Sequence, residues 1–180
     1  MVQNLVIEVI EEYNLSSSYQ KKIASLLQEA FPTYPAGKYY FNQLPSFRYL
    51  IWNDKKLIAH MGIEHRIIRL GDEIFRIFGL VDLCVAKGFQ SQKIASSFLK
   101  RIEKQAKECH IDFLLLATEG FDLYIKHGFK LVENTSKWLV IRKSESLGVL
   151  HRKLEDCLLY KPVNDKKWKD GTLDFLGTLF

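Results

Sequence analysis

The clearest hydrophobic pattern in this chain runs from residue 78 to residue 129. Residues 78–86 are mostly apolar and predict a buried strand, and a short polar loop follows at residues 87–92. A second apolar run, Phe113–Ala117, predicts another strand, and a short helix-like piece then ends at Gly128. Between the two strands, apolar residues recur at helical spacing with Lys and Glu among them: Ile94, Ala95, Phe98, Leu99, Ile102, Ala106 and Cys109. The pattern therefore predicts strand, loop, helix, strand, helix, with the loop opening the long helix.

The rest of the chain predicts one more helix and a meander of strands. Alternating apolar residues predict a strand over residues 2–10, and the pattern Ser17-x-x-Gln20 resembles the capping box of a helix that ends before Pro32. These elements indicate an α+β fold, one domain over residues 1–180 with a mixed, mostly antiparallel central sheet flanked by helices. An aromatic-rich loop is expected at residues 33–45, strands at 47–52, 57–70, 73–86, 137–142 and 158–162, and a polar connection or short helix at 144–152.

The composition agrees with this architecture. With 180 residues, of which 47% are hydrophobic and 26% charged, the chain has the size and composition of one globular domain. No apolar run reaches the about 18 residues of a membrane span, and the first residues do not resemble a signal peptide. Three scattered cysteines, Cys84, Cys109 and Cys157, favour reduced thiols in a cytoplasmic protein. Cys84 and Cys109 are expected to be buried as small apolar residues.

A net charge of +5 is compatible with nucleic acid, an anionic surface or an anionic cofactor as partner. The charges are dispersed, however. The predicted helix after residue 93 mixes Lys with Glu, and the lysines near Trp168 lie beside Asp165 and Asp170. No aromatic and basic array of the kind that binds RNA is present. We therefore expect no nucleic-acid partner and no membrane partner, and a monomer or homodimer.

The loop before the long helix has the chemistry of a phosphate site. The first turn of a helix leaves backbone N–H groups without intrahelical partners, and the helix dipole adds partial positive charge there. Residues 90–95 contain no Asp or Glu, and Lys87 and Lys93 add positive charge. By itself this pattern is shared with many helices that bind nothing.

Two motifs resemble the acetyl-CoA-binding core of the GNAT acyltransferases. The strand Leu83-Cys84-Val85 fits the family's Leu-x-Val, and the loop from Gln90 to Ala95 fits Gln/Arg-x-x-Gly-x-Gly/Ala at its ends, with Lys93 in place of the middle glycine. Downstream, Leu123-Tyr124-Ile125-Lys126-His127-Gly128-Phe129 fits Leu-Tyr-x-x-x-Gly-Phe. The resemblance implies a GNAT-like fold and acetyl-CoA as cosubstrate. It implies that the cofactor is bound by Leu83, Cys84, Val85, Gln90, Ser91, Gln92, Lys93, Ile94 and Ala95.

A second resemblance narrows the family. Residues 49–60 and 64–69 look like strands of the aminoglycoside 2′-N-acetyltransferase branch, and NodA shares some of this layout. The tail Leu173-Asp174-Phe175, with Phe180, is similar to the acidic and aromatic ending of that branch.

Acyl transfer from a thioester to an amine needs a base for the amine, donors for the developing oxyanion, and a proton for the thiolate. The resemblance implies that strand amides at residues 83–85 polarise the carbonyl and that Tyr124 is the general acid; the alternative is a Tyr that only packs and hydrogen-bonds. Asp82 interrupts an apolar strand, where a carboxylate is costly unless it is paired or hydrated. The resemblance makes Asp82 the base, acting through water, and the alternative is a carboxylate bound to Arg66 or Arg76.

The remaining candidates concern the acceptor. The resemblance implies that Asp82 and Asp174 contact the substrate. Glu119, which lies just after the second predicted core strand, and the carboxylate of Phe180 are expected to line the same cleft. The five histidines, His60, His65, His110, His127 and His151, show no metal-ligand spacing, so no metal site is expected, and a structural role is favoured for His60 and His65.

These features together lead to two hypotheses. The first is an N-acetyltransferase that moves an acetyl group from acetyl-CoA to a primary amine of a small molecule by direct attack, with an aminoglycoside as one candidate acceptor. The second is a CoA-binding or degenerate GNAT module with a sensing or interaction role, which Lys93 in the phosphate loop motivates.

Overall fold

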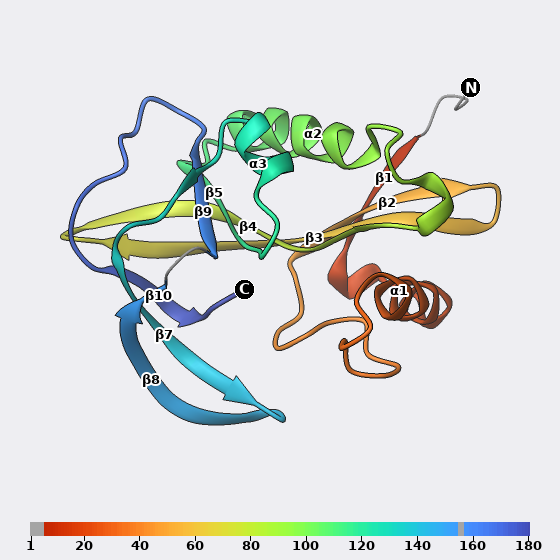
Figure 1. Ribbon diagram of the computed structural model, residues 1–180, viewed down its shortest axis with the longest axis horizontal. Coiled ribbons are helices and arrows are strands. Elements are labelled where there is room, and N and C mark those ends of the chain that lie inside the picture. Colours follow the sequence, from red (N-terminus) through yellow and green to blue (C-terminus); the bar gives the residue numbers. More distant parts are fainter. Residues whose placement is uncertain (1–5, 155–156) are drawn as a thin grey trace. The chain divides into compact units, whose positions relative to one another are not determined.

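The computed structural model describes residues 6–154 and 157–180 (Figure 1). They form two compact units: unit 1 contains the residues up to 64 and residues 81–101, and unit 2 contains residues 65–80 and 102–180. Two long strands, β3 (Lys56–Leu70) and β4 (Glu73–Val85), contribute residues to both units. The strand expected at residues 2–10 is β1 (Ile7–Glu11), and the part of that prediction at residues 2–5 lies outside the described residues.

Unit 1 is built on three antiparallel strands. β2 (Phe47–Asn53) pairs with β1 on one side and with β3 on the other, where the register runs from Phe47 opposite Ile63 to Asn53 opposite Lys56. Residues 48–51 of β2 are all buried, so neither face of this strand meets water. Consecutive burial on both faces is the reason why its sequence is continuously apolar apart from Arg48.

Two α-helices contribute to unit 1. α1 (Ser17–Ala30) begins one residue earlier than the capping-box pattern predicted, because Ser16 is the N-cap and its hydroxyl accepts from the N–H of Tyr19 at 3.3 Å. α2 (Ile94–Glu108) carries the predicted apolar stripe, and its Phe98 stacks on Tyr49 with 6.1 Å between ring centroids. The predicted burial of Cys84 is confirmed, whereas that of Cys109 is wrong: the helix ends at Glu108, and Cys109 is exposed just beyond it.

Unit 2 is a mixed sheet in which antiparallel pairs dominate. Its strand order is β6 (Lys130–Leu131), β9 (Leu158–Pro162), β5 (Phe113–Ala117), β4, β3, β10 (Leu173–Thr178), β7 (Thr135–Arg142) and β8 (Glu145–Lys153). Only β4 with β5 and β10 with β7 are parallel among the registers of the described residues. The β4–β5 register runs from Ile77 opposite Phe113 to Leu80 opposite Leu116. The expected α+β fold with a mostly antiparallel sheet is confirmed.

Unit 2 also contains the elements that the sequence pattern did not predict. Residues 144–152 were expected to form a polar connection or a short helix, but they form most of β8, which pairs along β7. Every residue of β8 is exposed, so it lacks the buried alternation by which strands are usually found. β10 and the two-residue β6 were not expected either. The short helix before Gly128 is α3 (Asp122–Lys126).

The core of unit 2 is aromatic. Phe113 makes edge contacts with Phe75 and Trp168, and Trp168 stacks on Tyr160 with centroids 4.1 Å apart. The indole N–H of Trp168 donates to the side-chain oxygen of Asn134 at 2.7 Å. This packing fixes the segment between β9 and β10 against β5 and β9.

Candidate functional site

Asp82 lies in β4 with an unusual backbone and a carboxylate held by one tyrosine. Its φ of 53° is left-handed, a conformation that is unusual within a strand and that Asp tolerates better than most residues. The hydroxyl of Tyr34, in the loop between α1 and β2, donates to Oδ2 of Asp82 at 2.8 Å. Burial raises the pKa of the Asp82 carboxyl, while the Tyr34 hydrogen bond and the charge of Arg48 partly oppose it. The site therefore contains a carboxylate that is a stronger base than an exposed Asp.

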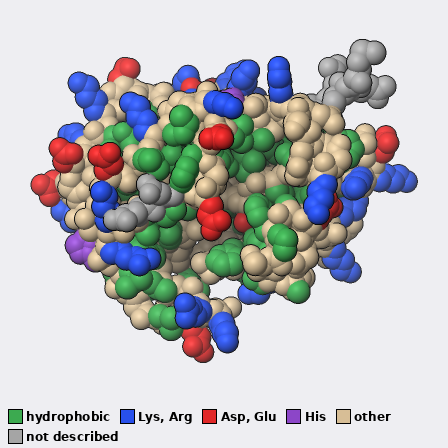
Figure 2. Space-filling view, in the orientation of Figure 1, with side chains coloured by type: hydrophobic (Ala, Val, Ile, Leu, Met, Phe, Trp, Pro, Cys, Tyr) green, Lys and Arg blue, Asp and Glu red, His purple; other side chains and the backbone are tan. Residues whose placement is uncertain are grey.

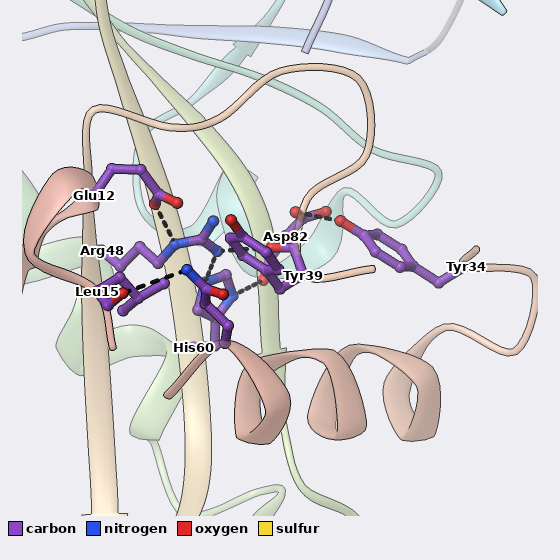
Figure 3. A network of polar contacts seen from close by, with 8 residues as sticks. Glu12, Leu15, Tyr34, Tyr39, Arg48, His60 and Asp82 are labelled. Carbon is purple, nitrogen blue, oxygen red and sulfur yellow. Dashed lines mark hydrogen bonds and ion pairs between the residues drawn. The ribbon is translucent and has the colours of Figure 1, made fainter. Parts of the chain in front are cut away.

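A buried network of polar side chains contacts Asp82 (Figure 3). The guanidinium of Arg48, which is fully buried, donates through Nε to the carboxylate of Glu12 at 2.6 Å. Its Nη1 donates to the carbonyl oxygen of Tyr39 at 3.0 Å and approaches Nε2 of His60 at 2.9 Å. Nδ1 of His60 lies 2.9 Å from the carbonyl oxygen of Asp82. Residues from η1 (Glu12–Asn14), β2, β3 and β4 thus meet in one network.

The protonation of His60 follows from its partners. A guanidinium only donates, so Nε2 of His60 must accept from Arg48 and the proton must sit on Nδ1, where it donates to the Asp82 carbonyl. Burial and the charge of Arg48 lower the pKa of His60 to about 3. The imidazole is therefore neutral at physiological pH with both nitrogens engaged, which agrees with the structural role expected for this histidine.

The loop between β4 and α2 keeps a tight backbone. After η2 (Lys87–Phe89), both Ser91 and Lys93 adopt left-handed conformations, with φ of 60° and 62°. Lys93 is the residue that stands where the family motif has glycine, and it holds the kind of conformation for which glycine is the default. A side chain in this region costs about 1–2 kcal/mol. The substitution has therefore changed the side chain at this point while leaving a glycine-like backbone.

The start of α2 fits an anionic group. The bond from Ser97 N–H to Lys93 O begins the helix, so the amides of Ile94 and Ala95 have no intrahelical acceptor. No acidic residue lies in the first turn. The carboxylate of Glu29 contacts this loop, where it accepts from the backbone N–H of Lys87 at 3.1 Å. The side chain of Gln90 donates to the carbonyl of Val85, which ties the loop to the end of β4.

The strand amides proposed for the thioester carbonyl belong to residues 83–85 of β4. Cys84 is buried, and Leu83 and Val85 are half-buried. The ladder to β3 continues past them, since Ala86 N–H donates to the carbonyl of Ile58 at 2.8 Å. Burial raises the pKa of the Cys84 thiol, so it stays protonated and is unsuited to be a nucleophile.

Tyr124 is in α3 of unit 2, where its ring meets Phe129 edge-on at 5.7 Å. Burial raises the pKa of Tyr124 to about 12. No described residue hydrogen-bonds its hydroxyl, so the alternative of a tyrosine whose hydroxyl has a structural partner receives no support.

The other residues that the sequence analysis expects to contact the acceptor substrate lie in unit 2 as well. Glu119 is exposed in the turn after β5. Asp174 is in β10 and pairs with Lys137 at 2.9 Å; burial raises the pKa of Asp174, but the N–H of Leu176 and the ammonium of Lys137 outweigh it and lower the value overall. Phe180 packs its ring over Gly79, and Arg66 lies over that ring at 4.6 Å while donating to the carbonyl of Thr178.

Four residues of the buried network were not singled out as site residues: Glu12, Tyr34, Tyr39 and Arg48. Arg48 carried a signal, because a charged residue between Phe47 and Tyr49 in an apolar strand must find a partner. Tyr34 carried none beyond its place in an aromatic loop, since its partner lies 48 residues away in sequence.

Figure 2 shows lysine and arginine side chains scattered over the face in view, with acidic side chains among them. Several lysines are paired, for example Lys161 with Glu103 at 2.7 Å. None of the described helices has both the length and the apolar content needed to cross a membrane.

The comparisons with known proteins agree on one family. The model of the acetyltransferase (GNAT) domain matches residues 13–132, which is more than half of the chain. Among solved structures, the chain is similar to the GNAT N-acetyltransferase YhbS of Escherichia coli in complex with CoA (12% identity, 94% of this chain and 88% of that chain, TM-score 0.65). It is also similar to E. coli ElaA (13% identity, 87% of this chain and 99% of that chain, TM-score 0.61). A third similar structure is the ribosomal-protein-S18-alanine N-acetyltransferase of E. coli (12% identity, 90% of this chain and 97% of that chain, TM-score 0.56).

Some longer matched structures, such as a GCN5-related N-acetyltransferase from Anabaena variabilis, are spanned over only 33% of their length. No curated protein sequence is significantly similar to this one. The structural likenesses show the fold, whereas the family model covers Arg48, His60 and Asp82 as well as the loop that opens α2. This chain belongs to the GNAT acetyltransferase family.

Proposed function

We propose that this chain transfers an acetyl group from acetyl-CoA to a primary amine of a small molecule, and that the whole chain acts as one acyltransferase domain. The observation that carries the proposal is Asp82, a largely buried carboxylate whose pKa is raised by burial, set in the strand that leads into the phosphate-type loop. An amine that is protonated in water must lose a proton before it can attack a carbonyl carbon. A carboxylate with a raised pKa, acting through water, is suited to accept that proton.

The loop and strand would bind the cosubstrate. The amides that open α2 suit the pyrophosphate of an acyl-CoA, and Lys93 supplies positive charge beside them. Acetyl-CoA supplies the thioester that is broken. The N–H groups of residues 83–85 would donate to its carbonyl oxygen as negative charge develops there.

The resemblance assigns Tyr124 to the leaving sulfur. Its hydroxyl, with a pKa raised to about 12, is protonated at neutral pH. Full transfer of this proton to a thiolate with an ordinary pKa near 8.5 would be uphill by roughly 5 kcal/mol. We therefore propose that Tyr124 acts mainly as a hydrogen-bond donor to the departing sulfur, and that the thiolate takes its proton from the amine by way of Asp82 and water.

The acceptor has two candidate classes. The resemblance of residues 49–60 and 64–69 to the aminoglycoside 2′-N-acetyltransferase branch supports a small amine, including an aminoglycoside. The likeness to a ribosomal-protein-S18-alanine N-acetyltransferase supports the N-terminus of a protein as the second candidate. A reducing compartment such as the cytoplasm suits three cysteines that form no disulfide, and we propose a monomer or homodimer.

The test measures CoA release from acetyl-CoA with two acceptor panels, small primary amines including aminoglycosides, and short peptides with free N-termini. We expect turnover with the first panel and its loss in Asp82→Asn. Turnover only with peptides would support the second acceptor class. If CoA binds but no acceptor of either panel is acetylated, the degenerate CoA-binding module would be favoured. The glycine-like backbone at Lys93 supports CoA binding, which both hypotheses share.

A further inference from the structure

The backbone of Asp82 is held by the side chain of His60. A left-handed residue within a strand is strained, so other contacts must stabilise it. The Nδ1–H of His60 donates to the carbonyl oxygen of Asp82 at 2.9 Å, which fixes the direction of the peptide bond that follows Asp82. The left-handed backbone at Asp82 affects where its carboxylate points and how the amides of residues 83–85 follow.

His60 is in turn fixed by Arg48. The imidazole is fully buried, and its Nε2 accepts from Nη1 of Arg48, so ring rotation would break two hydrogen bonds at once. Arg48 is anchored by Glu12 and by the carbonyl of Tyr39. The side chain of Glu12 is 11% exposed. The series of hydrogen bonds therefore runs from a carboxylate at the protein surface to the candidate base.

We propose that His60 and Arg48 are positioning residues for acetyl transfer, which hold Asp82 in its left-handed conformation and so aim its carboxylate. This inference rests on the proposed function, because it gives these residues a role through the base. His60 does not move protons itself, since both of its nitrogens are engaged.

The charged and titratable groups around Asp82 determine what a titration of this carboxyl can report. The titratable and charged groups that act on Asp82 come from three neighbouring elements and from β4 itself: Tyr34 in the loop before β2, Arg48 on β2, His60 on β3 and Cys84 on β4. Within this set, His60 and Cys84 stay neutral near pH 7, so a change in the titration of Asp82 reports a change in its burial or in its interactions with Tyr34 and Arg48.

Two amide variants separate the two hydrogen bonds of His60. The side-chain amide of Asn reaches the position of Nδ1, so His60→Asn keeps a donor for the Asp82 carbonyl and loses the acceptor for Arg48. The amide of Gln reaches the position of Nε2, so His60→Gln keeps the acceptor for Arg48 and loses the donor for Asp82. Each variant leaves one buried group without its partner, so the two should lose similar stability.

We expect kcat to fall about 100-fold in His60→Gln and much less in His60→Asn, with the KM for acetyl-CoA unchanged in both. The carboxyl carbon of Asp82, followed by NMR against pH, should titrate as in the wild type in His60→Asn and at a shifted pH in His60→Gln, because the burial of the carboxylate and its bond with Tyr34 both depend on where it points. Equal kcat and equal titration in the two variants would overturn the proposal.

Two readouts keep this test separate from the proposed function. If the wild type acetylates no amine, the proposed function fails, yet the titration of Asp82 in the two variants still decides whether His60 positions it. If a variant does not fold, the imidazole nitrogens of the wild type decide the geometry: their ¹⁵N shifts should show the Nδ1–H tautomer, neutral down to pH 5. An Nε2–H tautomer, or protonation near pH 6, would overturn the arrangement.

Discussion

The hydroxyl of Tyr34 donates a 2.8 Å hydrogen bond to the carboxylate of Asp82, which ties the aromatic loop between α1 and β2 to the strand that carries the candidate base. Tyr34 is itself buried, and burial and the charge of Asp82 raise the pKa of its hydroxyl, so it is a protonated donor at neutral pH. Tyr34 therefore holds the Asp82 carboxylate in place and also lowers its pKa against the effect of burial.

Replacing Tyr34 with Phe should move the pH dependence of the reaction. Burial raises the pKa of Asp82 and the Tyr34 hydrogen bond lowers it, so removing the bond leaves the raising effect less opposed. Asp82 must be ionised to accept a proton, and the acidic limb of kcat/KM should therefore shift to higher pH in Tyr34→Phe. Tyr40→Phe in the same loop is the matched control. Superimposable profiles for Tyr34→Phe and the wild type would show that the bond does not tune the base.

Asp82→Asn should stabilise the protein at neutral pH while removing activity. Because burial raises the pKa of Asp82 in the folded state, the stability of the wild type is full below the ordinary value near 3.9 and falls as the pH rises through the folded-state value. Asn carries no charge and also tolerates a left-handed conformation, so we expect a gain of roughly 1 kcal/mol at pH 7 that disappears near pH 3. Denaturant unfolding at the two pH values measures it.

Asp174→Asn is a control in which the change in stability at pH 7 should have the opposite sign. Although burial raises the pKa of Asp174, the N–H of Leu176 and the ammonium of Lys137 lower it overall, so its contribution to stability is present above the ordinary value and is lost in acid. Asp174→Asn should therefore destabilise the protein at pH 7. A stabilising effect of Asp174→Asn, or none of Asp82→Asn, would contradict the two opposite electrostatic environments.

The substitutions at Lys93 separate backbone strain from charge. Gly relieves the left-handed strain of about 1–2 kcal/mol but gains roughly 0.5–1 kcal/mol of freedom in the unfolded chain, so Lys93→Gly should stabilise the protein by about 0.5–1 kcal/mol. Lys93→Ala keeps the strain and removes the charge. If the charge assists phosphate binding, calorimetry should show the same loss of CoA affinity in both variants. An affinity lost only in Lys93→Ala would mean that the side chain at this position obstructs the loop.

Much of the fold could be predicted because buried elements leave a periodic record in the sequence. Phe113–Ala117 and Leu158–Pro162 were predicted to the residue, since each is a buried run ended by a polar or turn-forming residue. β8 left no such record, because both of its faces meet water and its strand form depends on pairing with β7. The cap of α1 was one residue off because Ser16, Ser17 and Ser18 are chemically alike, and only the backbone decides which of them caps the helix.

The candidate site was predictable only in part. A carboxylate in an apolar strand identified Asp82, and the polar loop identified the start of α2. The residues that hold Asp82 were not identified, because hydrogen bonds such as Arg48–His60 and Tyr34–Asp82 join separate elements. The left-handed backbone at Asp82 and Lys93 is likewise set by tertiary contacts that override the preference of these residue types.

Gly79 in β4 should be intolerant of a side chain because of Phe180. A Cβ added at Gly79 would lie 2.0 Å from Cε1 of the Phe180 ring, which also packs against Phe175 at 5.5 Å between centroids. We expect Gly79→Ala to destabilise the protein by about 1–3 kcal/mol through overpacking or displacement of the ring. In a Phe180→Ala background the same substitution should cost far less, as a double-mutant cycle of unfolding free energies would measure. Additive costs would show that the two positions do not compete for one space.

Tyr124→Phe should separate chemistry from binding. The hydroxyl accepts and donates no hydrogen bond among the described residues, and the ring keeps its edge contact with Phe129, so removing the oxygen should leave the stability within about 0.5 kcal/mol. If the hydroxyl donates to the departing sulfur, kcat should fall by roughly 10–100-fold while the affinity for CoA, measured by calorimetry, stays the same. Tyr160→Phe, in the aromatic core of the same unit, is the control for loss of a hydroxyl. A kcat that is unchanged in Tyr124→Phe would remove this residue from the reaction and leave the transfer to Asp82 and the backbone amides.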